Sequence, residues 1–242
     1  MITTSTPATD PAVLSEQVAY YRKRAGEYDE WWFRTGRYDH GADLNVAWAA
    51  DAAEVATALV RHLDETRPRR ALELACGTGL FTRWVASRVG HLLALDASPE
   101  VQAISRARVA AANVDYALAD LFAWQPAERY DVVFMSFWLS HVPDDHFDKF
   151  WAKVEAALAD GATAYVIDSG WDLTSSAKNH VRPDREAGVA ARKLKRRQRI
   201  PDREDLPRAC RARAAPRRAV PAVANRTYAA LFHPRRGVAL NA

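Results

Sequence analysis

Short apolar runs alternate with helix-length amphipathic segments over the middle of the chain. The apolar runs lie at 70–75, 91–96, 114–120, 130–137 and 163–169. Between several of them stand segments in which apolar residues recur at helical spacing, at 80–89, 99–113 and 144–161. This alternation is typical of βαβ units, in which helices cover both faces of a parallel sheet. The pattern therefore predicts an α/β fold.

Local sequence also predicts where helices begin and end. An Ala-rich segment at 47–65 has helical spacing, and the chain breaks the helix before Pro68. Ser98 followed by proline is a typical helix start, because serine caps the first turn and proline suits its first position. The pair Asp160-Gly161 predicts the end of the helix that begins near residue 144.

The composition excludes several classes of protein. With 242 residues, of which 49% are apolar and 26% charged, the chain has the makeup of one globular domain with room for an appendage. Two cysteines, Cys76 and Cys210, cannot form a disulfide framework and favour a reducing compartment. No apolar run reaches the roughly 20 residues that span a bilayer, and the N-terminus lacks the features of a signal peptide. We therefore expect a cytoplasmic protein without a membrane partner.

The first apolar run leads into a glycine-containing turn, Glu73-Leu-Ala-Cys-Gly-Thr-Gly79. Gly77 and Gly79 let the backbone approach a ligand closely, and the helix start behind them offers free N–H groups. Asp96 ends the second run and Asp120 the third, 23 residues after Glu73 and 24 after Asp96. An acid about 20 residues after such a turn is the expected acceptor for ribose hydroxyls. The three carboxylates should line one rim of a nucleotide-binding crevice.

These residues resemble class I S-adenosylmethionine (SAM) dependent methyltransferases, of the small bacterial type with an ELACGTG first motif. Ala75 stands where the first glycine of the family's motif usually lies. The resemblance covers roughly residues 15–194 and includes the segments YYRKRAGEYD, LALDASPE, ALADLFAW and YDVVFMSFWLSHVP. It implies a Rossmann-like sheet with helices on both faces, SAM as cofactor, and an enzyme that methylates a small molecule. It also implies an N-terminal lead and helical lid at 1–66 and a SAM-binding core at 67–194.

The resemblance further implies roles for individual residues. Gly77 and Gly79 pack on the methionine part of SAM, and Glu73 orients its amino acid end. Asp96 binds the ribose hydroxyls, while Asp120 with Leu121 holds the adenine. Residues 136–139 line the pocket beside the sulfonium. With Tyr28 from the aromatic N-terminal segment, the expected cofactor-binding residues are Tyr28, Glu73, Ala75, Gly77, Gly79, Asp96, Ala97, Asp120, Leu121 and Ser136.

Methyl transfer from a sulfonium asks little covalent chemistry of a protein, because the methyl group is already electrophilic. Holding donor and acceptor in line is the main contribution. Aromatic faces could stabilise the cation, and the candidates are Tyr20, Tyr28, Trp31, Trp32 and Trp138. The alternative is that the N-terminal aromatic residues form the buried face of a lid helix. His141 is the candidate general base where the acceptor must lose a proton, and the alternative is a hydrogen-bonded loop histidine.

Other interpretations of the turn are weaker. An NAD-binding loop requires glycine three residues after Gly79, where this chain has Thr82. The alternative is a purely structural turn, with Asp96 and Asp120 as solvent-exposed carboxylates at strand ends and Glu73 as a helix cap or a residue at the edge of the core. We expect Cys76 to pack as a small apolar residue, and no spacing of His, Cys and carboxylates suggests a metal site.

The C-terminal segment differs from the rest of the chain. Residues 191–242 carry 13 Arg and 2 Lys against three acids, a net charge of +12, whereas residues 1–190 carry −8. Residues 195–242 are rich in Arg, Ala and Pro and show no strand period, so we expect the last two strands of the family's sheet to be missing or disordered.

We hypothesise that a frameshift near Lys195 produced this basic tail, since codon choices for the segment permit a strand-like sequence in another frame. Two functional alternatives follow. The chain could be a SAM-binding remnant without turnover, or the tail could bind nucleic acid or other anions. Nucleic acid is the less favoured partner, because the tail shows neither interleaved aromatic residues nor a helical pattern. The acceptor, the methylated atom and the oligomeric state have no readable signal in the sequence.

Overall fold

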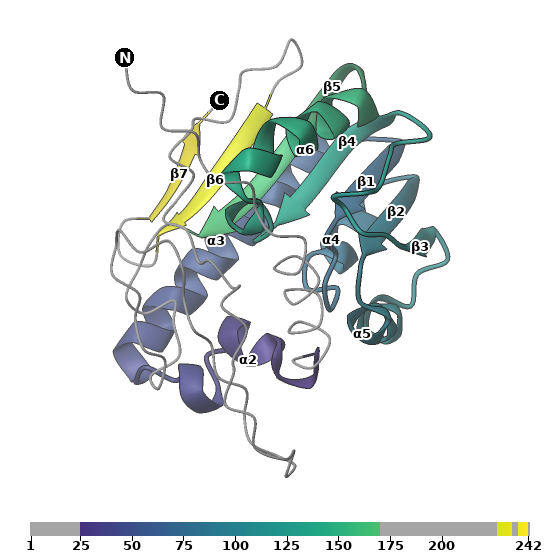
Figure 1. The fold of residues 1–242 in the computed structure, drawn as a ribbon. Coiled ribbons are helices and arrows are strands. Elements are labelled where there is room, and N and C mark those ends of the chain that lie inside the picture. The colour runs from purple at the N-terminus through teal and green to yellow at the C-terminus, as the bar shows by residue number, and fades with distance from the viewer. Residues whose placement is uncertain (1–24, 170–226, 234–236, 242) are drawn as a thin grey trace, which may run out of the picture.

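A computed structural model describes residues 25–169, 227–233 and 237–241. Seven strands form one sheet in the order β3-β2-β1-β4-β5-β6-β7 (Figure 1). In chain order they are β1 (Arg70–Leu74), β2 (His91–Asp96), β3 (Val114–Leu118), β4 (Tyr130–Ser136), β5 (Leu158–Ser169), β6 (Thr227–His233) and β7 (Gly237–Asn241). Neighbouring strands are parallel except for β6 and β7, which are antiparallel. The predicted α/β class with a parallel sheet is confirmed.

The strand order reverses beside β1. Its one edge pairs with β2, with Leu72 opposite Leu93, and its other edge pairs with β4, with Leu72 opposite Val133. From β1 the chain adds β2 and β3 on one side of the sheet, and from β4 it adds β5, β6 and β7 on the other side. Ligands of open α/β sheets bind in the crevice outside the carboxyl ends of the strands at such a reversal. The fold therefore directs attention to the residues that follow β1, β2 and β4.

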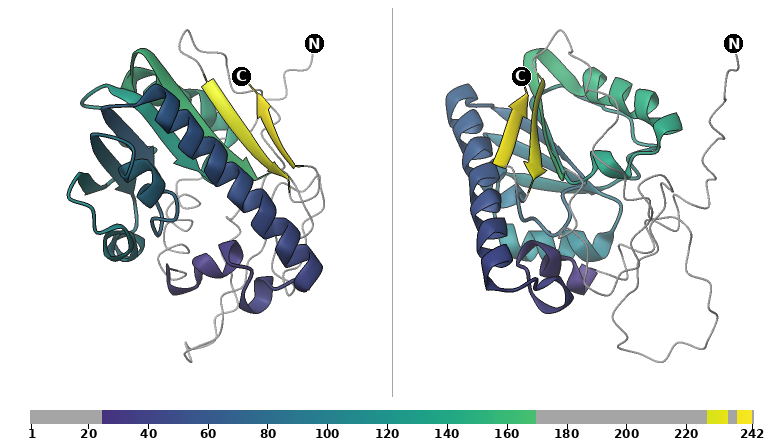
Figure 2. Two further views of the ribbon diagram at one scale, coloured as in Figure 1. Left: turned by 180° about the vertical axis from the view of Figure 1, so that it is seen from behind. Right: turned by 90° about the vertical axis from the view of Figure 1, so that its left-hand side faces the viewer.

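Helices cover both faces of the sheet (Figure 2). One face carries α3 (Ala42–Thr66), α4 (Thr82–Ala86) and α5 (Pro99–Val109), and the other carries α6 (Asp144–Ala157). Short helical turns complete the described chain: η1 (Ala25–Glu27), α2 (Asp29–Trp32), η2 (Gly36–Tyr38) and η3 (Leu139–His141). In Figure 1, α2 lies beyond the end of the sheet toward which the arrows of β4 and β5 point.

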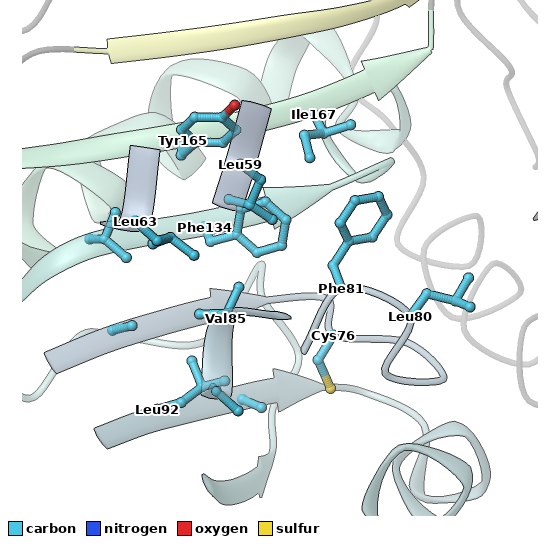
Figure 3. Close-up of a cluster of buried hydrophobic side chains, with 14 of the residues drawn as sticks. Leu59, Leu63, Cys76, Leu80, Phe81, Val85, Leu92, Phe134, Tyr165 and Ile167 are labelled. Atoms are coloured by element: carbon cyan, nitrogen blue, oxygen red, sulfur yellow. The ribbon is translucent and has the colours of Figure 1, made fainter. Parts of the chain in front are cut away.

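Alternation along the strands separates two apolar cores. On β4, Val132 and Phe134 face the core under α3 and α4, whereas Val133 and Met135 face the core under α6. All four side chains are buried, as expected of parallel strands covered on both faces. Figure 3 shows the first of these cores, and the buried side chain of Cys76 is part of it, as expected.

Helix ends follow the predicted signals, with one exception. The Ser98 hydroxyl accepts a hydrogen bond from the N–H of Val101 at 3.3 Å and so caps α5, whose first residue is Pro99. The helix α3 ends at Thr66, as predicted. The prediction that Asp160-Gly161 ends a helix is wrong, because α6 ends at Ala157 and these residues lie inside β5, where Gly161 has φ +76°.

The expectation that the last two strands are missing is also wrong. Thr227–His233 pairs with β5 from Ala164 to Ser169, and Gly237–Asn241 pairs with Thr227–His233 in turn. The prolines of the basic tail misled the prediction, because Pro221 and Pro234 flank the apolar run without interrupting it. A free edge on β5 also favours any partner strand that can pair with it. Residues 195–226 lie outside the described residues.

The helix α3 lies within the segment expected to be a lid, but it belongs to the core by packing. Val55, Leu59 and Leu63 are essentially fully buried against the sheet and α4. Among the residues that the structure describes, no helix is long and apolar enough to cross a bilayer.

Candidate cofactor site at the carboxyl edge of the sheet

The glycine-containing turn connects β1 to α4 through residues with left-handed backbone. Ala75, Gly77 and Gly79 have φ of 56°, 55° and 81°. The turn is closed from within, since the N–H of Gly79 donates to the carbonyl of Cys76 at 3.1 Å. It is also tied to β2, because the N–H of Cys76 donates to the carbonyl of Leu95 at 2.9 Å. These bonds fix the turn before any ligand arrives.

The two glycines of the turn have different neighbours. A Cβ on Gly79 would lie 2.5 Å from the hydroxyl oxygen of Ser105 and 3.0 Å from its Cα, so glycine is needed there for α5 to pack closely. The nearest atoms to a Cβ on Gly77 would be those of the Tyr28 ring and hydroxyl, at 3.7–3.8 Å. The backbone at Gly77 thus faces an aromatic side chain of the N-terminal segment.

Asp96 links the turn to the end of β2. Its Oδ2 accepts the N–H of Gly77 at 2.9 Å, and its Oδ1 accepts the N–H of Ser98 at 2.9 Å. Burial raises the pKa of this carboxyl, while the backbone N–H groups of Ser98, Gly77 and Ala97 lower it. Each oxygen has a further lone pair, so hydroxyl groups of a ligand could still donate to it.

Glu73 is the most unusual group of the site. Its side chain is only 1% exposed, and neither carboxylate oxygen has a hydrogen-bond partner in the described part of the chain. Desolvation raises its pKa to about 8, and the negative charge of Asp96 adds to the rise. The buried hydroxyl of Thr82 lowers this pKa but makes no hydrogen bond of ordinary length. An acid buried in this way lacks the cation or donor that would stabilise its charge.

The two candidate residues that follow β3 differ in exposure. The Oδ1 of Asp120 accepts the N–H of Phe122 at 2.9 Å, so this exposed side chain shapes its own turn. The side chain of Leu121 is 3% exposed and packs in the core beneath α6. Sequence reasoning missed Lys153 of α6, which donates to the carbonyl of Phe122 at 2.6 Å and holds the turn in place.

The residues after β4 form the opposite side of the strand reversal. Ser136 ends β4 half-buried, and His141, also half-buried, is the last residue of η3. Sequence reasoning missed Asp168, which is 2% exposed at the end of β5 and accepts the N–H of Ser140 at 2.7 Å. Asp168 therefore fixes η3, and with it the backbone of His141. An acid at the end of the fifth apolar run was the available signal.

Two of the candidate aromatic residues, Trp31 and Trp32, pack among other aromatic side chains. Trp32 is 7% exposed, and its carbonyl accepts the indole N–H of Trp48 at 3.0 Å. The ring of Trp31 lies 4.9 Å from that of Trp48 and 4.8 Å from that of Phe137, edge to face. This favours the alternative of a buried aromatic face for Trp31 and Trp32. Trp138 packs near Phe122 and Phe150 on the α6 side, and Tyr20 lies outside the described residues.

A polar network that the sequence did not reveal joins α2 to the turn. The Thr78 hydroxyl donates to Oδ1 of Asp29 at 2.5 Å, and Arg108 pairs with the other oxygen of Asp29. Arg108 also donates to the carbonyl of Thr78 at 2.8 Å. Nothing in the sequence indicated this network, because its three residues come from α2, the turn and α5, which are far apart along the chain.

The turn fits a nucleotide-like cofactor with a cationic end. Four candidate residues lie at the turn or at the end of β2: Tyr28, Gly77, Asp96 and Ala97. The unpartnered carboxyl of Glu73 belongs to β1, two residues before the turn reaches Ala75. Asp120, Ser136 and His141 follow β3 and β4 at the same edge of the sheet. Within residues 25–169, 227–233 and 237–241, no group of His, Cys, Asp or Glu side chains could hold a metal ion. The Glu73 and Asp96 carboxyl groups can accept hydrogen bonds from hydroxyl and ammonium groups of a ligand.

Comparison with known sequences identifies the middle of the chain. Residues 71–161 match a family described as methyltransferase domain. The trans-aconitate 2-methyltransferase of Streptomyces avermitilis is 32% identical over 114 residues, which cover 45% of this chain and 42% of that protein. The enzyme of the same name from Escherichia coli O139:H28 is 28% identical over 138 residues, covering 55% and 52%. The matches thus span about half the length of these curated relatives.

Comparison with solved structures extends the likeness to most of the chain. The complex of DhpI with S-adenosylhomocysteine (SAH) superimposes with a TM-score of 0.59 and is 33% identical, covering 77% of each chain. The DhpI–SAM–HEP complex gives the same TM-score at 32% identity, covering 78% of this chain and 79% of that one. Sequence motif, sheet topology and these likenesses agree, and the chain therefore belongs to the class I SAM-dependent methyltransferase family.

Proposed function

We propose that this chain transfers a methyl group from SAM to a small-molecule acceptor. SAM supplies the electrophilic methyl group on its sulfonium when bound. The observation that carries the proposal is the convergence of the Glu73 and Asp96 carboxyls on the Gly77 turn, at the strand reversal of a methyltransferase-like sheet. The buried carboxyl of Glu73 lacks a counter-charge, which the ammonium group of SAM would provide.

Each candidate residue has a place in this proposal. Gly77 and Gly79 hold the turn on which the methionine part packs, with Ala75 at its start and Tyr28 across from Gly77. The Asp96 carboxylate accepts the ribose hydroxyls. The remaining expected contacts are Ala97 and Asp120 beside the nucleoside, Leu121 through its backbone, since its side chain is buried, and Ser136 beside the sulfonium.

The acceptor is proposed to be a small carboxylic acid. The support is the relatives in two bacterial genera that are named trans-aconitate 2-methyltransferases. Carboxylates are ionised at neutral pH, so the acceptor oxygen needs no general base. His141 would act as a general base only for acceptors that must lose a proton. The hydrogen bond from the N–H of Ser140 to Asp168 holds the backbone next to His141 in place.

Calorimetry with SAH tests the cofactor site. Asp96→Ala removes a carboxylate that accepts two backbone N–H groups, and we expect a loss of roughly tenfold or more in SAH affinity. Asp131→Ala is the matched control, because Asp131 also accepts two backbone N–H groups, those of Arg69 and Arg70, at the other end of β1. Equal losses in both variants, or no binding by the folded parent chain, would contradict the cofactor assignment.

Transfer of radiolabelled methyl groups from SAM to a panel of small di- and tricarboxylic acids tests the acceptor. We expect labelled, base-labile esters from at least one acid and none from the matching amides. SAH binding without labelled product from any of these acids, or from alcohols and amines added to the panel, would instead favour a SAM-binding remnant without turnover.

A further inference from the structure

Three segments far apart in the sequence meet in one polar network beside the turn. Asp29 begins α2, Thr78 lies between the two glycines, and Arg108 stands in the last turn of α5. Nη1 of Arg108 donates to the Thr78 carbonyl at 2.8 Å and to its hydroxyl oxygen at 3.0 Å, while Nη2 pairs with Asp29. The Thr78 hydroxyl completes the ring by donating to Asp29 at 2.5 Å.

This network lies next to the contact between Tyr28 and the turn. Tyr28 precedes Asp29, and its ring and hydroxyl lie 3.7–3.8 Å from where a Cβ of Gly77 would stand. Thr78 follows Gly77 directly. Any shift of Asp29 relative to Thr78 therefore moves Tyr28 relative to Gly77.

We propose that Arg108 is a positioning residue for the cofactor site, because it binds Asp29 and Thr78 together and so sets Tyr28 over Gly77. This inference rests on the proposed function. Arg108 does not touch the ligand in this account; it acts through Tyr28 and the turn.

The chemistry of arginine suits this role. The planar guanidinium places one nitrogen on the carboxylate of Asp29 and another on the carbonyl of Thr78. The Asp29 and Arg108 side chains are about one-quarter exposed, so solvent weakens the attraction of their charges without abolishing it. Lysine has a single ammonium at the end of a flexible chain and cannot hold both partners in the same geometry.

Arg108→Met and Arg88→Met form a matched pair for testing the proposal. The Arg88 side chain is 28% exposed against 24% for Arg108, and it likewise pairs with an acid, Asp64, and donates to a backbone carbonyl, that of Trp84. Its contacts lie at the far end of α4, away from the turn. Both variants remove one ion pair, and only one of them touches the network.

Binding and dissociation of SAH are measured for both variants well below their melting temperatures. We expect Arg108→Met to raise the Kd of SAH about tenfold, mostly by faster dissociation, and Arg88→Met to leave it within about twofold. On a logarithmic scale of Kd, Arg108→Lys should recover less than half of the SAH affinity that Arg108→Met loses. In a Tyr28→Ala background, Arg108→Met should add little, because the positioned residue is already gone.

The outcomes separate this inference from the proposed function. A parent chain that binds no SAH overturns both. A parent chain that binds SAH overturns the inference alone if Arg108→Met changes only the melting temperature, or if its effect adds fully to that of Tyr28→Ala. Should Arg108→Met fail to fold, Asp29→Asn serves in its place, since the amide still accepts the Thr78 hydroxyl but no longer pairs its charge with Arg108.

Discussion

At the scale of single residues, the burial of Glu73 makes the stability of the fold depend on pH. Its pKa is about 8 in the folded chain and 4.5 when solvated, because burial disfavours the charged form. Between these pH values the folded chain keeps a proton that the unfolded chain releases. The free energy of unfolding should therefore fall as pH rises through this range, by at most about 1.4 kcal/mol per pH unit from this group. Above pH 8 the penalty is complete and constant.

Glu73→Gln removes this penalty. We expect the variant to be more stable than the parent at pH 8.5 and to gain less, or nothing, at pH 4.5, as measured by urea unfolding at both values. Glu128→Gln is the control, since Glu128 is exposed and pairs with Arg70 near the start of β1. If Glu73 also holds the SAM ammonium, the same variant should bind SAM more weakly while being more stable. A Glu73→Gln variant that is less stable at pH 8.5 would contradict the account.

The turn gives a second prediction at this scale. Gly79→Ala should destabilise the fold by roughly 3 kcal/mol, because its Cβ would clash with the backbone of Ser105 in addition to straining φ. Gly161→Ala is the control, because φ is again positive but no atom lies within 4 Å, and it should cost only about 1 kcal/mol. Ala75→Gly should stabilise the chain by about 0.5–1 kcal/mol by relieving a left-handed alanine. Denaturant midpoints of the three variants give this order or refute it.

The sequence predicted residues whose role depends on chain order, and it missed those whose role depends on packing. Asp96 was expected at the same rim as the glycine-containing turn, and it accepts the N–H of Gly77, because strand ends of a parallel sheet share one edge. Arg108 gave no signal, since its partners Asp29 and Thr78 lie far from it in the sequence. Lys153 gave none because it binds the backbone carbonyl of Phe122, which any residue could supply. The burial of Leu121 was also beyond prediction, because neither core could be drawn before α6 was placed.

At the scale of elements, mutations in α3 test whether this helix belongs to the core or to the lid that the sequence predicted at 1–66. Leu59→Ala should cost about 3 kcal/mol in unfolding free energy, because Leu59 is fully buried between α3 and the sheet. Val46→Ala, on the same helix but 70% exposed, should cost less than about 0.5 kcal/mol. If both variants unfolded like the parent in a single urea transition, α3 would be a lid that the core does not need.

Elements were predicted best where apolar periodicity and punctuation agreed. The runs 91–96 and 70–75 became β2 and β1 almost to the residue, and α5 starts at its proline. The end of α6 was missed because a glycine stops helices but also accommodates positive φ inside a strand, as Gly161 does in β5. Composition averaged over the basic tail concealed the apolar run of β6.

At the scale of the whole molecule, two observations disagree about the C-terminal segment. The sheet includes two of its strands, whereas its charge and composition suggest a non-native tail. Residues 191–242 carry a net charge of +12, and their composition is the origin of the frameshift hypothesis, which sequencing the gene across codons 190–200 tests directly. The same tail contains β6 and β7, which extend the sheet beyond β5. A strand that covers an otherwise open edge contributes stability regardless of the history of its gene.

Truncation after Leu194 decides between these views. It would leave the edge of β5 from Ala164 to Ser169 unpaired, so we expect aggregation in size-exclusion chromatography and a broadened, lower thermal transition. Replacing Arg203, Arg208, Arg211 and Arg213 by glutamine is the control, because it removes four charges and leaves both strands in place. If loss of the strands is the cause, the control stays monodisperse and the truncated chain does not. A truncated chain that stays folded and binds SAH like the parent would show that β6 and β7 contribute nothing to the fold, as a non-native tail requires.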